Sequence, residues 1–511
     1  MAKAQKYRAS KQSYTSPLQQ ILLGFETPFA KELNPDNRWV KLAHIIPWDS
    51  LVSEYRLKMN NSRTGADGIN PRVAIGSIII KHMCDLSDRE TVLQIQENMY
   101  MQYFIGFSSF SNEEPFDASL FVEFRKRMDI DYINKMNEKI LGIKHPQEAE
   151  EEQLEEEEAG IKEEQIGEQK EVKLEGQLIL DATACPQDIS YPTDLNLLNT
   201  AREKLEELID YLYESSKEEK KPRTYRVKAR KEYLKIAQKK VKRKKEIRAG
   251  IRKQLGYVSR DMKHIDKLIE RHPELKLDKY QNKYLLVIKE VWRQQKQMYD
   301  QNIHSIENRI VSLHQAHVRP IVRGKTNANV EFGAKIHVSL MNGYAFLDDL
   351  SWDAYNEGKR LIGSVEKYHN RFGHYPESIL VDKIYCTREN RAWLKEKGIT
   401  LRAKPLGRPK AVTTKHVSPG ERNPIEGKFG QAKTTYGMNR IKARLKNTSE
   451  SWIATIILVL NLVKLAGQVP YYMILRVMTY SASYINTLKR YLKHNDLNIS
   501  FNLKTINVIT G

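Results

Sequence analysis

The stretch that decides the fold is ERNPIEGKFGQAK, residues 421–433. Asn423 followed by Pro424 predicts the start of a helix, because asparagine caps helices well and proline lacks only an N–H that the first turn leaves unpaired. This numbering puts Glu426 at the third helical position, in the positive field of the helix terminus. Lys433 follows about two turns later, so it projects from the same face as Glu426.

Two glycines within this stretch weaken the helix intrinsically. Gly427 and Gly430 therefore predict the close approach of another backbone or of a ligand. Taken alone, Glu426 is equally consistent with one half of a capping box. Two upstream strands that end in aspartate favour a role in a site instead.

The two upstream strands are short apolar runs bounded by polar sequence. Residues 177–183 contain the first run, which ends at Asp181, and residues 378–382 form the second, which ends at Asp382. Such runs are typical of strands that are buried on both faces. We therefore expect both aspartates at the carboxyl ends of buried strands.

The remaining segments complete an α/β order. Alternating residues, an Asn-Gly turn and a returning apolar run predict a hairpin, and amphipathic helices and a short strand follow. In chain order these segments are residues 334–340, 342–343, 344–347, 355–372, 388–397 and 399–402. Strands and helices in this order predict an α/β fold around a mixed sheet.

Three carboxylates are expected to converge at this sheet. Ligands of open α/β sheets gather outside the carboxyl ends of strands, so Asp181, Asp382 and Glu426 should meet there. They would repel one another unless cations neutralised them, and hard oxygen ligands suit Mg²⁺ or Mn²⁺. Two such ions about 3.5–4 Å apart can clamp the attacking and leaving oxygens of a phosphodiester displacement. Asp181 is the expected shared ligand, because the first strand is central in such sheets.

Composition points to a polyanionic partner. The chain has 511 residues, enough for two or three domains, with a net charge of +20 and a pI near 9.4. No apolar run follows the basic start, and the longest one, residues 453–463, is too short to span a bilayer. We expect a cytoplasmic protein without membrane contact, in which Cys84, Cys185 and Cys386 are reduced thiols.

Shifts in composition divide the chain into segments. Residues 147–171 hold twelve glutamates against two lysines, a block of like charge that repels itself and predicts a linker. We predict a flexible basic arm, a helical N-terminal DNA-binding domain, an acidic linker, a split catalytic core, a helical insertion and a C-terminal extension. Their ranges are residues 1–35, 36–145, 146–175, 176–198 with 319–467, 199–318 and 468–511.

Within the N-terminal domain, two consecutive helices resemble a helix-turn-helix. The first follows Pro71, and the second begins after Ser87. Such pairs are also common as plain packing units, so both interpretations stay open.

The helical insertion carries the densest positive charge. Residues 220–253 hold seventeen Lys or Arg against two acids, which favours contact with phosphates over a merely solvated face. The candidate DNA-binding residues of this segment are Lys239, Lys240, Lys242, Arg243, Lys244 and Lys245.

Together these motifs resemble the DDE transposases of bacterial insertion sequences. The residues that carry the resemblance are 180–183, 191–194, 381–385, 407–409, the opening stretch, and residues 70–90 and 102–106. Arg422, Glu426 and Lys433 match the spacing of the family's Arg-x3-Glu-x6-Lys signature. The tyrosine expected three residues before the arginine is Pro419 here, which puts any contact of that tyrosine in doubt.

The resemblance implies a ribonuclease-H-like catalytic core and a metal-dependent reaction with two ions. DNA would be hydrolysed at the insertion-sequence ends, and the freed 3′-hydroxyl would attack target DNA. The implied partners are the terminal inverted repeats and target DNA, bound by a homodimer or larger assembly. Arg422 and Lys433 would hold phosphates near the cut, with Arg408 and Lys428 as further DNA-binding residues.

Two alternatives remain open at this point. The first is a nuclease with the same core but no strand transfer, and the second is a DNA-binding derivative of a transposase that has lost catalysis. Asp188, Asp194 and Glu357 are further acids, which we interpret as caps or braces of loops. Cys185 and Cys386 are interpreted as packing residues.

Overall fold

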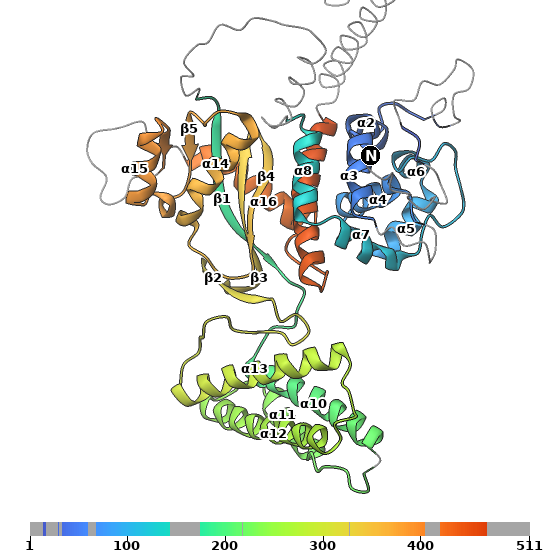
Figure 1. The fold of residues 1–511 in the computed structure, drawn as a ribbon. Coiled ribbons are helices and arrows are strands. Elements are labelled where there is room, and N and C mark those ends of the chain that lie inside the picture. Colours follow the sequence, from blue (N-terminus) through green and yellow to red (C-terminus); the bar gives the residue numbers. More distant parts are fainter. Residues whose placement is uncertain are drawn as a thin grey trace, which may run out of the picture.

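The computed structural model describes most of the chain (Figure 1). The described residues are 14–16, 29, 33–59, 68–143, 174–216, 218–325, 328–403 and 419–467. Most of the predicted basic arm, nearly all of the predicted acidic linker, Arg408 and the predicted C-terminal extension lie outside the described residues.

The N-terminal region is helical, and α4 is its centre. Every residue of α4, Pro71–Met83, is buried, and Asn70 caps it by accepting a hydrogen bond from the N–H of Arg72. Helices α3 (Trp48–Leu57), α5 (Asp88–Glu97) and α7 (Phe121–Arg127) contact it, and α2 (Arg38–Ile45) packs with α6 (Met99–Phe104). Helix α8 (Ile130–Ile140) lies beside the sheet instead, where Asn137 donates to the carbonyl of Ala345 (Figure 1).

The helix pair α4 and α5 carries little positive charge on its accessible side. Because α4 is buried throughout, only α5 could face DNA, and its exposed residues include Arg89, Glu90 and Glu97. Two acids against one base suit a packing unit better than a helix that reads a groove. Asp88, at the start of α5, forms ion pairs with the buried Lys81 and Arg125.

The region that contains both strands with the predicted aspartates is built on a mixed sheet, as expected, and this sheet has six strands. Its strands are β1 (Gln177–Pro186), β2 (Arg319–Lys325), β3 (Ala328–Met341), β4 (Tyr344–Ser351), β5 (Ser378–Leu380) and β6 (Thr400–Arg402). The order is β2-β3-β1-β5-β6, with β4 also paired to β3, so β1 is central. β5 runs parallel to β1 and to β6, whereas β3 is antiparallel to β1.

The hairpin between β3 and β4 was predicted correctly, but β2 was not expected. Asn342 and Gly343 both have positive φ, at 49° and 78°, which suits the tight turn that the sequence indicated. β2 pairs with β3 beside the insertion and shows no clear alternation of its own.

The prediction that the first strand ends at Asp181 was wrong. β1 continues to Pro186 because β3 pairs with it throughout, from Ile179 opposite Leu340 to Pro186 opposite Gly333. It is β5 that ends early, after Leu380. Asp181 therefore lies where β5 separates from β1.

Helices cover both faces of the sheet (Figure 1). One face packs against α14 (Leu361–Phe372) and α15 (Arg388–Glu396), which follow the 3₁₀ turn η2 (Glu357–Arg360). The other face packs against α16 (Asn423–Thr434) and the helix Lys446–Gly467. The N-terminal helices share this second core, so it joins the two ends of the described chain.

The helix Lys446–Gly467 is long and apolar enough to cross a membrane, but 72% of its most apolar window is buried inside the protein. Trp452 contacts the N-terminal domain, with its ring 4.7 Å from the ammonium group of Lys81. Asn461 accepts a hydrogen bond from the N–H of Ala345 on β4 at 2.8 Å. These contacts identify it as a core helix.

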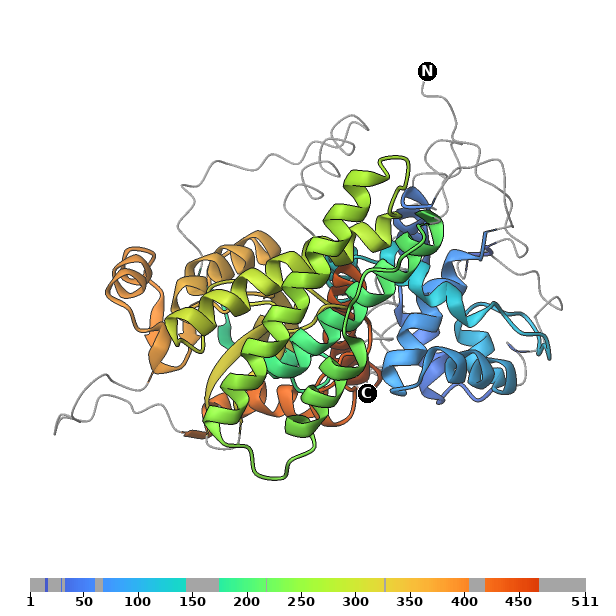
Figure 2. The same ribbon diagram turned by 90° about the horizontal axis from the view of Figure 1, so that it is seen from below.

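Four helices lie between β1 and β2, where the sequence indicated a helical insertion. They are α10 (Asp194–Ser216), α11 (Arg226–Ala237), α12 (Lys244–Arg271) and α13 (Lys279–Gln301). The first begins at Asp194, earlier than residue 199. α10, α12 and α13 bury a hydrophobic core of their own, α11 packs against α10 and α12, and the long helices run side by side in Figure 2. The insertion is thus a four-helix unit beside the sheet.

Candidate active site

The site lies where β1 and β5 separate. The parallel register pairs Ile179 with Leu380, so Asp181 and Asp382, two residues further on, lie at the same level. Arg422 lies between them. Its Nη2 is 3.0 Å from Oδ2 of Asp181, and its Nη1 is 3.6 Å from Oδ1 of Asp382. One guanidinium therefore bridges the two aspartates.

Backbone N–H groups hold both carboxylates in place. Oδ1 of Asp181 accepts from the N–H of Ala182 at 2.9 Å. Oδ1 of Asp382 accepts from the N–H of Lys383 at 2.7 Å, and so caps the 3₁₀ turn η3, Lys383–Tyr385. These bonds favour the ionised carboxylates, because a charged acceptor binds an N–H more strongly than a neutral one does.

Helix α16 begins one residue earlier than predicted. A 3₁₀ turn, η4 (Pro419–Arg422), leads directly into Asn423, so Arg422 occupies the cap position and no side chain caps the helix. Glu426 is consequently the fourth helical residue. Its side chain is exposed, so the capping-box alternative does not apply.

The face of α16 that carries Glu426 is bare. A Cβ placed at Gly427 or Gly430 would have no protein atom within 4 Å, and both residues are exposed. Close approach of another backbone, which the glycines predicted, is therefore absent among the described residues. The same open space beside Glu426 is accessible to a ligand.

The charges around Asp181 act in opposite directions on its pKa. Burial raises this pKa above its ordinary value, the Arg422 guanidinium and the Ala182 N–H lower it, and the charges of Glu357 and Glu426 raise it. Net, the pKa is raised. Glu426 is thus among the charges that act on Asp181, but, contrary to the prediction from the sequence, the three carboxylates do not come close enough together in the described residues to hold an ion.

Glu357 is a further acid near Asp181, which the sequence analysis interpreted as a cap or brace of a loop. Its Oε1 is 2.8 Å from Nζ of Lys335 on β3. The turn η2 that carries it packs directly on η3, because a Cβ on Gly358 would be 2.6 Å from the carbonyl oxygen of Ile384. The Asn390 amide donates at 2.8 Å to the carbonyl of Gly358 and also, at 2.8 Å, to that of Tyr385.

A buried polar chain supports the turn after Asp382. The hydroxyl of Tyr385 lies 2.9 Å from Nε2 of His337, and Nδ1 of His337 lies 2.9 Å from the hydroxyl of Ser364. Burial lowers the pKa of His337, so the ring is neutral and can donate at one nitrogen and accept at the other. Sequence reasoning missed this chain, which fixes Tyr385 beneath the site.

The three carboxylates have the chemistry that divalent cations need, but in this structure they are not close enough together to form a metal site. Within the described ranges, no three His, Cys, Asp or Glu side chains converge closely enough to hold an ion. Asp181, Asp382 and Glu426 nevertheless offer only hard oxygen donors, as Mg²⁺ or Mn²⁺ requires. A positive group already lies between two of them, because Arg422 bridges the aspartates.

Two lysines of α16 have different surroundings. Lys428 is half-buried and donates to the carbonyl of Leu460 at 3.3 Å, and burial lowers its pKa. Its ammonium group is therefore engaged inside the protein. Lys433 is half-buried and lies about two turns beyond Glu426, as expected.

The predicted basic cluster of the insertion is exposed. Lys239 to Arg243 lie in the loop between α11 and α12, and Lys244 and Lys245 begin α12. Among the described residues, Lys239 alone of the six forms an ion pair with an acid, at 2.9 Å from Glu246. The remaining five positive charges are available to a partner.

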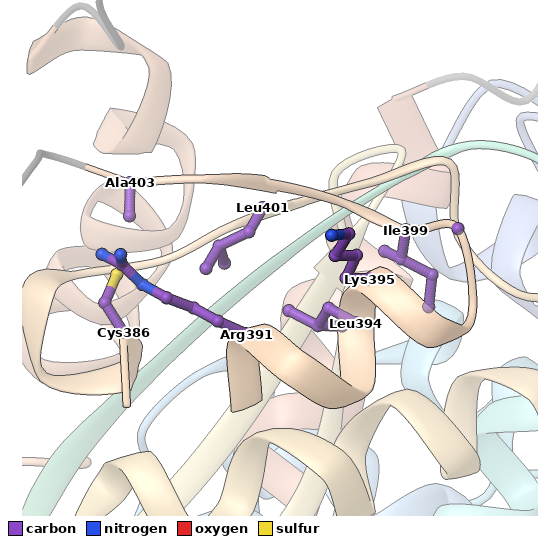
Figure 3. Close-up of a pocket in the computed structure, with 8 residues that line it drawn as sticks. Cys386, Arg391, Leu394, Lys395, Ile399, Leu401 and Ala403 are labelled. Carbon is purple, nitrogen blue, oxygen red and sulfur yellow. The ribbon is translucent and has the colours of Figure 1, made fainter. Parts of the chain in front are cut away.

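A pocket of about 530 Å³ lies beside α15 and β6 (Figure 3). Figure 3 shows Arg391 reaching toward Cys386, with Lys395 further along the same helix. None of the three carboxylates lines it. Its one link to the site is Cys386, which follows η3, so the chemistry does not belong to this pocket.

Comparisons with known proteins find two transposase family models that match parts of this chain. A family model described as a transposase DDE domain matches residues 379–463, and one described as a transposase domain (DUF772) matches residues 28–127. The first range contains Asp382 and Glu426. The chain is 32% identical over 169 residues to a Rhizobium meliloti protein described as the uncharacterized protein ORF8 in nfe locus. That alignment covers 32% of this chain and 69% of the other protein. No solved structure matches significantly.

Proposed function

This chain belongs to the DDE transposases of bacterial insertion sequences, and we propose that it hydrolyses DNA at insertion-sequence ends and joins the freed 3′-hydroxyls to target DNA. The observation that carries the proposal is the bridged pair, Asp181 and Asp382, level on adjacent parallel strands. Together with Glu426, it supplies the three carboxylates of such a reaction.

The sheet supports a ribonuclease-H-like core as part of this proposal. A central first strand is paired antiparallel to β3 on one side and parallel to β5 on the other, and helices cover both faces. The third carboxylate then comes from a helix that packs on the sheet after the last strand. Asp181, Asp382 and Glu426 thus come from three elements that are far apart in sequence.

When bound, Mg²⁺ or Mn²⁺ would activate the attacking oxygen and stabilise the charge that develops at the phosphorus centre. Asp181, Asp382 and Glu426 are the residues that would hold two such ions. The chain's own contribution is positioning, because the N–H groups of Ala182 and Lys383 fix the two aspartates. No described side chain is required as a covalent nucleophile.

The path of DNA is proposed from charge and from open space. The bare face of α16 leaves room beside Glu426, and Lys433 lies further along the same helix. The exposed basic loop between α11 and α12 would hold the phosphate backbone at a distance from the cut, without reading sequence. The double-stranded partners would be the terminal inverted repeats and target DNA.

We propose a homodimer or larger assembly on DNA. Joining two ends to one target needs two strand-transfer reactions, and the sequence contains no internal repeat that could supply a second carboxylate set. Symmetric homo-oligomers are the usual way to act at two equivalent sites. A net charge of +20 should keep chains apart until DNA neutralises it.

The test of the catalytic proposal is a cleavage and joining assay on oligonucleotide duplexes that carry the insertion-sequence ends. Asp382→Asn should abolish cutting and joining while binding to the ends changes little. Asp188→Asn is the matched control, because Asp188 follows the same strand but pairs with Arg440 at 3.0 Å. Cutting without joining by the wild type would favour the nuclease alternative, and no metal-dependent cutting would favour the non-catalytic one.

The test of the DNA path is the salt dependence of binding. Replacing Lys240, Lys242, Lys244 and Lys245 by alanine should reduce the slope of log K against log salt by about 3–4 units, on specific and random duplex alike. Replacing Lys289 and Lys296 is the control, because their ammonium groups already pair with Asp266 and Asp300. An unchanged slope in the fourfold variant would make the basic loop a solvated surface.

A further inference from the structure

Arg422 occupies the position between Asp181 and Asp382 that a bridging cation would need. Its two terminal nitrogens lie 3.0 Å and 3.6 Å from oxygens of the two carboxylates, and its Nε is buried with no hydrogen-bond partner among the described residues. A guanidinium with one orphaned N–H is not fully satisfied by its present surroundings. The position is therefore one that the side chain holds for its charge.

The lone pairs that Arg422 uses are the ones that a bridging ion would need. Oδ1 of Asp181 is already bonded to the Ala182 N–H, so Oδ2 is the oxygen that remains, and Arg422 binds it. On Asp382, Oδ1 is likewise shared between the Lys383 N–H and Arg422. A divalent ion and the guanidinium cannot occupy this gap together, because both are cations competing for the same oxygens.

Arginine cannot give way by losing a proton, because its pKa lies far above any working pH. It must move instead, and the local structure permits that. The neighbouring Glu421 anchors the turn η4 to the edge strand through Arg402, at 2.6 Å. This pair holds the backbone next to residue 422, so the movement falls to the long side chain.

We propose that Arg422 is a resident counter-cation of the two aspartates, which divalent ions displace when they load the site. In the metal-free chain it keeps two like charges together at the separation of β1 and β5. On displacement its planar fork becomes available to a DNA phosphate, which it suits better than a lysine would. Metal loading and DNA engagement are coupled through one side chain. This inference rests on the proposed metal-dependent function.

The test measures Mn²⁺ binding to the full-length protein without DNA, from the resonance signal of the free ion. Arg422→Ala should bind Mn²⁺ about tenfold more tightly than the wild type, a difference of about 1.4 kcal/mol. Arg422→Lys should lie between them, since it keeps the charge but loses the fork. Arg440→Ala is the control, because it removes the same charge from an Arg–Asp pair outside the site, and it should stay within about twofold.

An affinity of Arg422→Ala equal to or weaker than that of the wild type would overturn the proposal, and so would undetectable binding in both proteins. Asp181→Asn separates this outcome from failure of the proposed function. If that variant binds Mn²⁺ as well as the wild type does, the carboxylates are not the metal site at all. Should Arg422→Ala fail to fold, Arg422→Gln answers the same question, because it removes the charge while keeping a polar side chain.

Discussion

The active-site region and the helical insertion both place arginines among carboxylates, but they treat the charges differently. In the site, Arg422 is 18% exposed and Asp382 53%, so water and ions can reach the group. In the insertion, Arg202 is 1% exposed and bound to Glu206, which is 9% exposed, while Asp261 of α12 is fully buried. Neither oxygen of Asp261 has a hydrogen-bond partner within the part of the chain that the structure describes.

The difference is one of purpose. A carboxylate without a partner cannot stay charged in a closed interior, and burial, with the nearby charge of Glu206, raises the pKa of Asp261 to about 7. At the site, by contrast, an arginine lies between the aspartates and backbone N–H groups bond to them, at a place that water and ions can reach. Accessible carboxylates next to a movable cation can bind ions and take part in a reaction. Carboxylates buried in a closed interior mainly affect stability.

The largest effect that separates the two regions should appear in the cleavage rate. Asp181→Asn is expected to slow metal-dependent cutting by about 10³-fold or more, because the transition state loses a ligand to its cations, a cost of about 4 kcal/mol. Asp261→Asn makes the same chemical change in the insertion and should leave the rate within about twofold. Single-turnover cleavage of an end-containing duplex measures both. Equal losses would mean that the insertion takes part in the chemistry.

The next effect concerns stability, where the change in the insertion should have a larger effect than a change at the site. Arg202→Ala should destabilise the insertion by about 3–5 kcal/mol, because it removes the buried guanidinium bound to Glu206 and leaves only the more exposed Arg226, 3.9 Å away. Hydrogen exchange of the α10 and α12 amides measures this free energy locally. A loss below about 1 kcal/mol would show that water reaches this cluster, and the contrast with the site would disappear.

The pH dependence of the insertion should be unusual for a carboxylate. The pKa of Asp261 is about 7 in the folded chain and near 3.8 when unfolded, so the folded state binds more protons between these values. Stability therefore falls as pH rises from about 4 to 7 and levels off above, a loss of about 2–3 kcal/mol between pH 5 and 8. Asp261→Asn should remove the slope and be more stable than the wild type at pH 8. Local exchange at both pH values, corrected for intrinsic rates, tests the sign.

The smallest effect is expected from a third arginine–aspartate pair. Arg440 lies 3.0 Å from Asp188, but the two side chains are 66% and 40% exposed. Arg440→Ala should change the free energy of unfolding by less than about 1 kcal/mol, because solvent screens the pair and holding it costs side-chain entropy. Thermal unfolding beside Arg202→Ala gives the comparison. A loss as large as that of Arg202→Ala would show that exposure does not govern these pairs.

The sequence by itself determined the elements and most of the carboxylate set. Apolar runs, the Asn-Gly turn and the Asn-Pro helix start are local signals. They predicted the α/β order and the central first strand, and they placed the start of α16 within one residue. Asp181, Asp382 and Glu426 were proposed from expected strand ends and a helix start, and β1 in fact continues past Asp181 to Pro186. The same local signals failed for β2, which depends on pairing with β3, and for the end of β1.

Only the tertiary structure decided how distant segments meet. The position of Arg422 between two aspartates depends on the register of β1 with β5 and on the turn η4, which lie far apart in sequence. The sealed Asp261 depends on the packing of α12 against α10, and nothing in its neighbouring residues marks it as buried among charges. Burial and the distance between charges are properties of the packed chain. Folding therefore decides whether an arginine and an aspartate form a site or lower the stability of the protein.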